Sequence, residues 1–478
     1  MLSNRYRAVS PSLVLVGTLL AGIVQASSSA LVIENVNLLP MTSEAVLPAR
    51  TVVIVDHRIA AICERRDKCV PAGATRIDGT GKYLMPGLTD MHAHVESSFL
   101  PASASEAARE NANQAMRQQL RLYVLYGVTT IRDPLGGPEN LIARGRIERG
   151  EQVGPRLFTA AGAMDGDPPL AAYSTPFSTP EAAIAYVHET AAAGYDFVKV
   201  YSTLPPHIYD AIATAAKDVG LPFVGHVPML VDFKHALESG LRSIEHLSGY
   251  DVACTPNAAR TLPTIDNVYQ GWAYCTRQKI AALAALTASY LVWNVPTLVV
   301  IDSVLPDYER SISSAPDWLA DFNAYIPPAL RNNSLYYEII NARARAGFKA
   351  TRAVRLALVK ALSDAGAPIL LGTDTPASGY NVHQELDLLR EAGLTPYQVL
   401  TAATSEPARY FDRVGQFGTV VVGASADLLL LDANPLESVT NAHRIRGVMV
   451  RGDWWPHDRL DAEFAALQRE FAAYRPAD

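Results

Sequence analysis

The feature that most constrains the fold is a unit repeated through the middle of the chain, in which a short apolar run precedes a helical stretch. The apolar runs have strand character, and the stretches between them are rich in Ala and Leu. Two of these stretches end at Gly194 and Gly220, which is typical of helix C-termini. Strands that alternate with helices favour a parallel sheet. The runs are LTDMHAH, VTTIRDP, RLFTAAG, FVKVYS, FVGHVP, SIEHLS, LVWNVPT and ILLGTDTP.

The repeated unit predicts an α/β fold, a (β/α)8 TIM barrel over residues 86–411, because the runs are eight in number. A doubly wound open sheet is the alternative, but no Gly-rich nucleotide fingerprint follows a strand. The long connection between NVPTLVV and ILLGTDT predicts an insertion at about 299–350. Since such barrels carry their sites at the carboxyl ends of the strands, we expect this insertion to reach the active face.

Both ends of the chain are rich in predicted strands and indicate a further domain. Runs of β-branched residues broken by Gly and Asp occupy residues 27–85 and 412–456. We expect these two segments to pair as a small β-sandwich domain, followed by a helical tail at residues 457–478. With 478 residues, 49% hydrophobic and 19% charged, the chain can bury one large core and one smaller core.

The pattern of residues 1–26 predicts a secretory signal peptide, which would not be part of the fold. Arg5 and Arg7 precede the apolar stretch LVLVGTLLAGIV, and the small residues QASSSA follow it. We predict cleavage after Ala26, with Ala30 as the alternative site. A membrane anchor is the other interpretation, but the apolar stretch is shorter than the roughly 20 residues of a spanning helix. The mature protein is thus expected to be exported, periplasmic or secreted, with no membrane anchor.

The cysteines and the net charge limit the chemistry and the partners. Export permits disulfides, and the cysteines fall into two local pairs, Cys63 with Cys69 and Cys254 with Cys275. Whether these pairs form disulfides or bind metal stays open, although neither has the spacing of a structural zinc site. The net charge of -7 gives no reason to expect nucleic acid as a partner. A homo-oligomer stays open.

Two histidines lie where the first predicted barrel strand ends. Residues i and i+2 of a strand point to the same face, so His92 and His94 point the same way. Two imidazoles that face the barrel axis can bind one metal ion, whereas outward-facing ones would be buried under helices. Lys199 lies between two valines in FVKVY and is expected to face the axis too, where a bare ammonium is costly. A snorkelling lysine is the alternative.

Three more polar residues, His226, His246 and Asp374, end further predicted strands. Taken singly, each histidine is explained at least as well by a satisfied polar residue. Together with His92, His94 and Lys199 they would stand at the ends of strands 1, 4, 5, 6 and 8 of one barrel. Because six independent coincidences are improbable, the pattern favours one common site.

This pattern resembles the amidohydrolase superfamily, and the resemblance covers nearly the whole mature chain. GKYLMPGLTDMHAH resembles the superfamily's entry to its first strand, and GVTTIRD resembles its second strand. HQELDLLREAGLTPYQVLTAATSEPARY and GTVVVGASADLLLLDANPL resemble its closing helices and its return to the β domain. The chain is most similar to a branch of exported dipeptidases near imidazolonepropionase, with prolidase-like and ochratoxinase-like members.

The resemblance implies two divalent metal ions, with zinc as the default and manganese or cobalt as alternatives. A free lysine is a cation and cannot ligate two cations, whereas a carbamate formed from Lys199 and CO2 has one oxygen for each ion. The resemblance assigns His92 and His94 to one metal, His226 and His246 to the second, carboxylated Lys199 to both, and Asp374 to the first metal and to proton transfer.

The expected function is that of an exported binuclear metal-dependent amidohydrolase. Its small-molecule substrate would be a peptide, an N-acyl amino acid or a similar amide, such as an ochratoxin-type amide, attacked by a metal-bridging hydroxide. Asp374 would be the catalytic acid and base. The alternative is hydrolysis of esters, lactones or phosphotriesters at the same site. A non-catalytic binding protein and a mononuclear deaminase-like enzyme are rivals, and the latter would not need Lys199.

Three residues are weaker candidates for contacts with the substrate. Tyr201 shares the inward face of Lys199, although it is explained equally well as filling of the barrel rim. Arg132 could bind a carboxylate, with an internal pair to Asp133 as the alternative. His383 either reaches the site or has a structural role. After strand 3 the chain reads AGAMDGDPPLAAY, without the Gly-Gly-His with which some dipeptidases of the branch hold an α-carboxylate, which argues against a simple dipeptidase.

Overall fold

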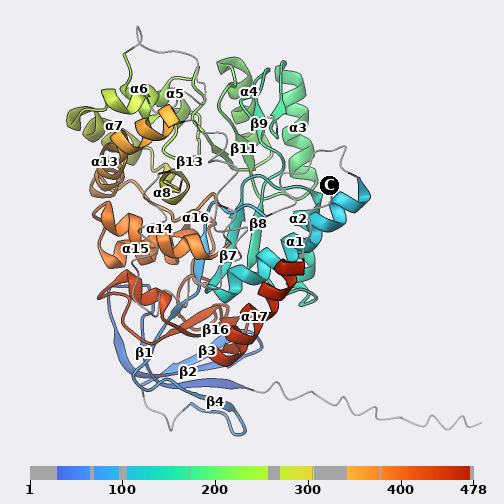
Figure 1. Ribbon diagram of the computed structural model, residues 1–478, viewed down its shortest axis with the longest axis vertical. Helices are drawn as coiled ribbons and strands as arrows, with labels where there is room; N and C mark the ends of the chain where they lie inside the picture. Colours follow the sequence, from blue (N-terminus) through green and yellow to red (C-terminus); the bar gives the residue numbers. More distant parts are fainter. Residues whose placement is uncertain are drawn as a thin grey trace, which may run out of the picture.

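The computed structural model describes residues 30–64, 69–95, 105–171, 173–256, 270–303, 305, 342–375 and 378–473. The predicted signal peptide (1–26) and most of the predicted insertion (306–341) lie outside the described residues. The described part is a mixed α/β fold with three sheets (Figure 1). Within it, no helix combines the length and the apolar character needed to cross a membrane.

The largest sheet has eight strands and joins the two ends of the chain. Its strand order is β17-β16-β15-β5-β1-β2-β3, with β4 beside β1. The join is the antiparallel pair of β5 and β15, in which Leu84 lies opposite Leu430 and both are buried. This sheet lies at one end of the molecule, below the rest of the chain in Figure 1. Its strands are β1 (Leu31–Leu38), β2 (Leu47–Val55), β3 (Arg58–Cys63), β4 (Thr75–Asp78), β5 (Tyr83–Pro86), β15 (Leu428–Leu431), β16 (Ile445–Val450) and β17 (Asp453–Pro456).

The middle of the chain forms two parallel sheets, most of whose strands are buried on both faces. Runs such as VTTIRD in β7 are buried throughout, as expected where helices cover both faces. One sheet has the order β6-β7-β8 and the other β10-β9-β11-β12-β13-β14. The strands are β6 (Leu88–Asp90), β7 (Val128–Asp133), β8 (Arg156–Thr159), β9 (Met164–Asp165), β10 (Thr175–Pro176), β11 (Val198–Val200), β12 (Phe223–Gly225), β13 (Ser243–Glu245) and β14 (Trp293–Val295).

Single backbone contacts connect these sheets. Ala160 and Phe197 form a parallel bridge between the β8 and β11 segments, and Asn294 bridges Ile369. The amide of Met91 donates to the carbonyl of Leu371 at 2.8 Å. The run ILLGTDTP, expected as a full strand, is present only as this bridged segment. Its backbone still pairs on both sides, since the amide of Leu370 donates to the carbonyl of Asn294 at 2.8 Å and the amide of Thr373 to that of His92 at 3.3 Å.

Helices cover the parallel sheets, and their starts follow capping rules. The predicted helices before Gly194 and Gly220 are confirmed as α3 and α4. The hydroxyls of Thr179 and Thr276 accept from backbone amides at the starts of α3 and α7. The helices are α1 (Glu106–Leu125), α2 (Pro138–Glu148), α3 (Pro180–Ala192), α4 (Pro206–Asp218), α5 (Phe233–Glu238), α6 (Tyr250–Cys254), η4 (Gln270–Tyr274), α7 (Arg277–Ser289), α8 (Leu298–Asp302), α13 (Ala342–Asp364), α14 (Tyr380–Glu391), α15 (Pro396–Ala402), α16 (Ser405–Tyr410), η5 (Val439–His443) and α17 (His457–Ala473).

Both cysteine pairs left open by the sequence are disulfides in the structure. Cys63 at the end of β3 bonds to Cys69, and Cys254 at the end of α6 bonds to Cys275 just after η4. The second disulfide closes a segment of 21 residues. In the structure these four cysteines therefore form disulfides and do not ligate metal.

Candidate metal centre

The six predicted ligands come from the carboxyl ends of parallel strands. His92 and His94 follow β6, and Lys199 is the middle residue of β11. His226 follows β12 directly, and His246 follows β13 directly. The last member, Asp374, follows the bridged segment at Ile369. Parallel strands bring such ends to the same edge of a sheet, which explains why residues so distant in sequence can meet.

One half of the centre consists of His92, His94 and Asp374. Each can offer one ligand atom such that all three atoms lie within 4.8 Å of one another. The Oδ1 atom of Asp374 is 2.9 Å from Nε2 of His94 and 3.7 Å from Nε2 of His92. All three side chains are buried. Two imidazoles and a carboxylate at these spacings suit a divalent ion such as zinc.

The other half begins where His246 approaches Asp374. Nδ1 of His246 is 3.7 Å from Oδ2 of Asp374, and its ring is 4.5 Å from that of His92. The ring of His226 lies 5.0 Å from that of His246. The four imidazoles thus form one continuous cluster, in which His246 contacts both His226 and His92 and so connects the two pairs.

Lys199 lies in the same buried region. Its neighbours Val198 and Val200 belong to the large hydrophobic core, and Lys199 itself is only 3% exposed. Burial lowers the pKa of Lys199 to about 8, against the raising effect of Glu245 and Asp374. A lower pKa leaves more of the neutral amine, which is the form that adds CO2.

Each imidazole is held through its Nδ1 atom, which leaves Nε2 for another partner. Because a hydrogen bond at one ring nitrogen fixes the tautomer and the ring orientation, these contacts are typical of metal-ligating histidines. Nε2 of His226 is buried and has no hydrogen-bond partner among the described residues. An orphaned buried nitrogen is costly and fits a ligand atom that awaits a metal. The Nδ1 contacts are His92 with Glu245 (2.7 Å), His94 with Asp133 (3.2 Å), His226 with Ser202 (2.8 Å) and His246 with Thr297 (2.7 Å).

Burial and neighbouring charges shift the pKa values of the groups in the centre in different directions. Burial lowers the pKa of His226 well below its usual value and that of His246 to about 4, so both rings stay neutral. Burial acts the same way on His94, but the carboxylates of Asp133 and Asp374 raise its pKa to about 9. Burial opposes ionisation of Asp374, yet the neighbouring histidines hold its pKa well below the usual range. The neutral rings of His226 and His246 and the ionised Asp374 are in the states that bind metal, whereas His94 has to lose its proton before it can do so.

Three residues of the centre adopt left-handed backbone conformations. The φ angles are 59° at His246, 46° at Thr297 and 54° at Asp374. Such conformations cost non-glycine residues of order 1–3 kcal/mol each and tend to gather at functional sites. Here they turn two ligands, and the threonine that holds one of them, away from the strand direction.

A buried ion pair lies directly behind His92. Both oxygens of Glu245 are 2.7 Å from Nη2 of Arg132, and one of them also accepts from Nδ1 of His92. Nη1 of Arg132 donates to Ser243 (3.0 Å) and to the hydroxyl of Tyr410 (2.9 Å). Arg132 is fully buried and pairs with Glu245, not with Asp133 as the alternative of an internal pair assumed. Its donors are engaged within the protein, so the structure offers no support for a substrate contact by Arg132.

The other two weaker candidates lie apart from each other. The ring of Tyr201 is 4.1 Å from that of His226, beside the metal ligands. His383 is fully buried in α14, where Nε2 contacts the carbonyl of Tyr126 at 2.8 Å and the ring is 4.6 Å from that of His443. The structure thus brings Tyr201 to the ligand cluster and places His383 in a packing contact.

Sequence reasoning missed Glu245 and Asp133, the acidic partners of His92 and His94. For Glu245 a signal existed in SIEHLS, where an acidic residue directly precedes a predicted ligand in an otherwise buried strand. A buried carboxylate needs a cation or hydrogen-bond donors, and two lie on the neighbouring strand segments. Asp133 entered the sequence argument only as a partner for Arg132.

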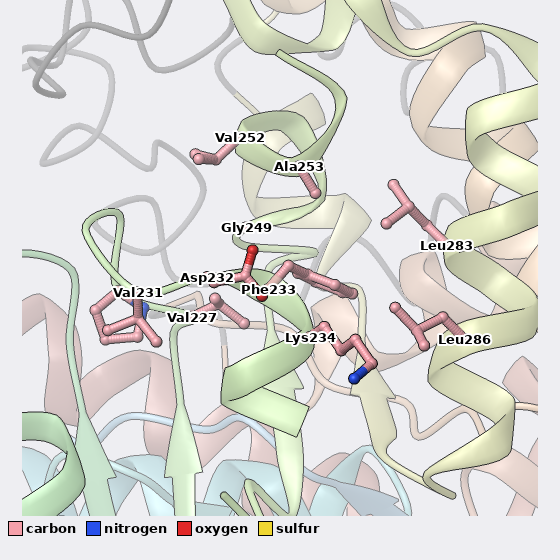
Figure 2. A pocket seen from close by; sticks show the side chains of 11 residues that line it. Val227, Val231, Asp232, Phe233, Lys234, Gly249, Val252, Ala253, Leu283 and Leu286 are labelled. Atoms are coloured by element: carbon pink, nitrogen blue, oxygen red, sulfur yellow. The ribbon is translucent and has the colours of Figure 1, made fainter. Parts of the chain in front are cut away.

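A separate cavity of about 210 Å³ lies beyond the loops that follow His226 and His246. It is lined mostly by apolar side chains from these loops and from α5, α6 and α7, with Phe233 near its middle and Leu283 and Leu286 facing it from α7 (Figure 2). None of the six predicted ligands lines it. The cavity is therefore distinct from the metal centre.

The parallel α/β framework and the cluster of histidines with a carboxylate define a class of proteins, the α/β proteins that carry a candidate metal site at the carboxyl ends of parallel strands. The chain belongs to the amidohydrolase family, since a family model described as "Amidohydrolase family" matches residues 83–455. Membership indicates a hydrolase that is generally metal-dependent and a TIM barrel with a β domain. The resemblance to the amidohydrolase superfamily is confirmed by this match.

Two curated relatives match short stretches of the chain. Adenine deaminase 2 of Bradyrhizobium sp. (strain ORS 278) is 40% identical over 83 residues, which are 17% of this chain and 14% of that protein. The 5-methylthioadenosine/S-adenosylhomocysteine deaminase of Symbiobacterium thermophilum is 36% identical over 77 residues, 16% of this chain and 18% of that protein. The chain spans less than a fifth of the length of these relatives.

Solved structures similar over nearly the whole chain show the fold. Bottromycin amidohydrolase has a TM-score of 0.71 at 24% identity, covering 92% of this chain and 90% of that one. An Xaa-Pro dipeptidase with bound methionine has a TM-score of 0.65 at 20% identity, with 90% and 100% covered. Ochratoxinase of A. niger has a TM-score of 0.63 at 18% identity, with 90% and 96% covered.

Proposed function

We propose that the protein is an exported, binuclear metal-dependent amidohydrolase that cleaves the C–N bond of a peptide, an N-acyl amino acid or a similar amide. The observation that carries this proposal is a largely buried cluster of four imidazoles, all held through Nδ1, in which Nε2 of His226 has no partner within the described part of the chain. The names of the similar structures, which include a dipeptidase, an amidohydrolase and ochratoxinase, agree with an amide substrate.

The proposed ligand set follows from the two halves of the cluster. His92, His94 and Asp374 would hold one ion, and His226 and His246 would hold the second, with zinc as the default metal. Lys199, if carboxylated by CO2, would offer carbamate oxygens to the ions, because its buried amine would otherwise face them as a competing cation. Bound divalent ions supply Lewis acidity and lower the pKa of water to about 7.

Asp374 is the proposed proton carrier. One of its oxygens is 2.9 Å from His94 and the other faces His246 at 3.7 Å, so it stands between the two halves. The neighbouring histidines keep Asp374 ionised, so that the carboxylate is in the state that can accept a proton from the attacking water. It then delivers that proton to the leaving nitrogen, which an amide requires because a free amide anion is a poor leaving group. An ester would need this step less.

The fold-level parts of the proposal go beyond the sheets described above. We infer a closed (β/α)8 barrel over residues 86–411, an insertion at about 299–350, a composite β domain from 27–85 and 412–456, and a C-terminal helical tail over 457–478. The bridges at Ala160 and Asn294 support closure. The two disulfides support export behind a signal peptide over 1–26, since disulfides persist in oxidising compartments.

Metal analysis and a substrate panel test this proposal on the purified protein. We expect about two divalent ions per chain and hydrolysis of at least one dipeptide or N-acyl amino acid, faster than of aryl esters and lactones. A chain that holds no ion, or that cleaves esters but no amide in a broad panel, refutes it.

A mononuclear deaminase is the second candidate, favoured by the short matches to deaminases and by a triad sufficient for one ion. Such an enzyme would release ammonia from adenine or a related base and would not need Lys199. A Lys199→Ala protein that keeps its full metal content and full rate would support the deaminase, whereas loss of both supports the binuclear site. Lys217→Ala, on the outer helix α4, is the matched control.

A further inference from the structure

The segment that follows β14 holds His246 at two points. The amide of His246 donates to the carbonyl of Val295 at 2.9 Å, and Nδ1 of its ring lies 2.7 Å from the hydroxyl oxygen of Thr297. Thr297 is fully buried and has a left-handed φ of 46°. The place of the His246 ring therefore depends on what holds residues 295–299.

Thr297 precedes the short helix α8, but its side chain does not cap that helix. At the starts of α3, α7 and α15, the hydroxyl of a threonine accepts from a backbone amide of the first turn. Thr297 makes no such contact, and its hydroxyl faces His246 instead. The first amides of α8 need another acceptor, because buried amides without a partner are costly.

Glu385 supplies that acceptor from α14, which packs against α8 (Figure 1). Its two oxygens accept from the amides of Leu298 at 3.0 Å and Val299 at 2.7 Å. The side chain is fully buried, and burial raises its pKa to about 8. Within the described ranges Glu385 has no ion-pair partner, whereas the buried Glu245 has Arg132. Since a carboxylate buried without a cation is costly, these two amide contacts are what offsets its burial.

We propose that Glu385 is a positioning residue, which holds Thr297 through the amides of Leu298 and Val299 and so places the ring of His246 for the second metal ion. This inference rests on the proposed binuclear site. Because Glu385 takes over the capping contacts, the hydroxyl of Thr297 is left for His246. Glu385 is not itself a ligand, so its effect on the metal should pass through His246.

NMR of the metal-free protein with isotope-labelled histidine side chains tests the placement. The ring-nitrogen signals of His246, assigned with His246→Gln, should shift in Glu385→Gln, because the amide NH2 group cannot accept from a backbone amide. Asp302→Asn is the matched control. Asp302 is a buried carboxylate at the other end of α8, where it accepts from Nε of Arg352 at 2.6 Å, so its loss should leave the His246 signals unchanged.

Stepwise titration of the metal-free protein with divalent cobalt tests the consequence. The step that Thr297→Val weakens belongs to the His246 half, since the Thr297 hydroxyl contacts that ring. We expect Glu385→Gln to weaken the same step about tenfold and to leave the other step unchanged. In the Thr297→Val background, Glu385→Gln should add less than about twofold, because both changes act through one contact. Glu385→Asp, which draws the carboxylate back from the two amides, should act in the same direction and serves if Glu385→Gln does not fold.

Three results overturn the inference in a folded variant of Glu385. They are unchanged His246 signals, an unchanged affinity for the second cobalt ion, and an effect that adds in full to that of Thr297→Val. If the wild-type protein binds two ions and cleaves an amide while neither readout responds, this inference alone fails. If the wild-type protein binds a single ion or cleaves no amide while the His246 signals shift as expected, the proposed function fails and the placement of His246 by Glu385 stands.

Discussion

The buried pair of Arg132 and Glu245 offers the sharpest test of how the centre is held. Glu245 binds Nη2 of Arg132 with both oxygens and also accepts from Nδ1 of His92, all at 2.7 Å. Glu245→Gln keeps the shape of the side chain but removes its charge. It leaves the guanidinium of Arg132 buried without a counter-ion and places an amide where His92 needs an acceptor.

Two separate losses are expected from Glu245→Gln. Removing one partner of a buried ion pair destabilises a protein by about 3–5 kcal/mol, and both side chains here are fully buried. Loss of the group that orients a metal-binding histidine typically lowers metal affinity 10- to 100-fold, or about 1.4–2.7 kcal/mol. The two losses differ in origin, so they are measured separately.

Urea unfolding of the metal-free protein measures the first loss, and competition with a chelator measures the second. Glu151→Gln is the matched control, because Glu151 also binds an arginine with both oxygens but on the exposed surface, where no effect is expected. Unchanged stability and unchanged metal affinity of Glu245→Gln would show that this network does not support His92, and the reasoning would be wrong.

Three other changes probe the shared ligand, a buried histidine and a disulfide. Lys199→Ala should lower the metal content below two ions per chain in elemental analysis, because the shared ligand is lost. Burial lowers the pKa of His383 to about 4. As the pH falls from 6.5 to 4, the unfolded chain binds a proton at this histidine and the folded chain does not, so the free energy of unfolding should fall by about 3 kcal/mol. His383→Gln should lack this part of the pH dependence of unfolding. Replacing Cys254 and Cys275 by serine should lower the free energy of unfolding by about 3 kcal/mol, as expected for a closed loop of 21 residues, with the double variant compared in urea.

The placement of the candidate ligands at one end of the parallel strands could be predicted because it depends on local rules. Alternation along a strand places Lys199 opposite its flanking valines, and the ends of parallel strands meet at one edge. The same rule, applied to Arg132 and Asp133, would have separated them, since neighbours on a strand point to opposite faces. In the structure Asp133 contacts His94, whereas Arg132 contacts Glu245, which lies 113 residues further along the chain. Only the folded chain reveals a partner at that separation.

The loop contacts could not be predicted, because no period governs them. Tyr173 meets Tyr201 next to a turn in which the amide of Gly166 donates to the hydroxyl of Thr203, 37 residues away, and the carboxylate of Asp165 accepts from the amide of Thr203, 38 residues away. The last predicted strand was wrong as a regular strand, because only Ile369 of its described residues forms a bridge there, with Asn294.

The two halves of the metal centre depend on different parts of the fold. His226 and His246 follow β12 and β13, which are paired neighbours, so that half is built locally. His92 and Asp374 come from the first and the last parallel segments along the sequence. Asp90 joins these segments, because it accepts from the amides of His92 and Thr373 at 3.0 Å each. Because Asp90 holds together the two segments that carry His92 and Asp374, disturbing this junction should weaken metal binding at the first half while the imidazoles of the second half keep their places.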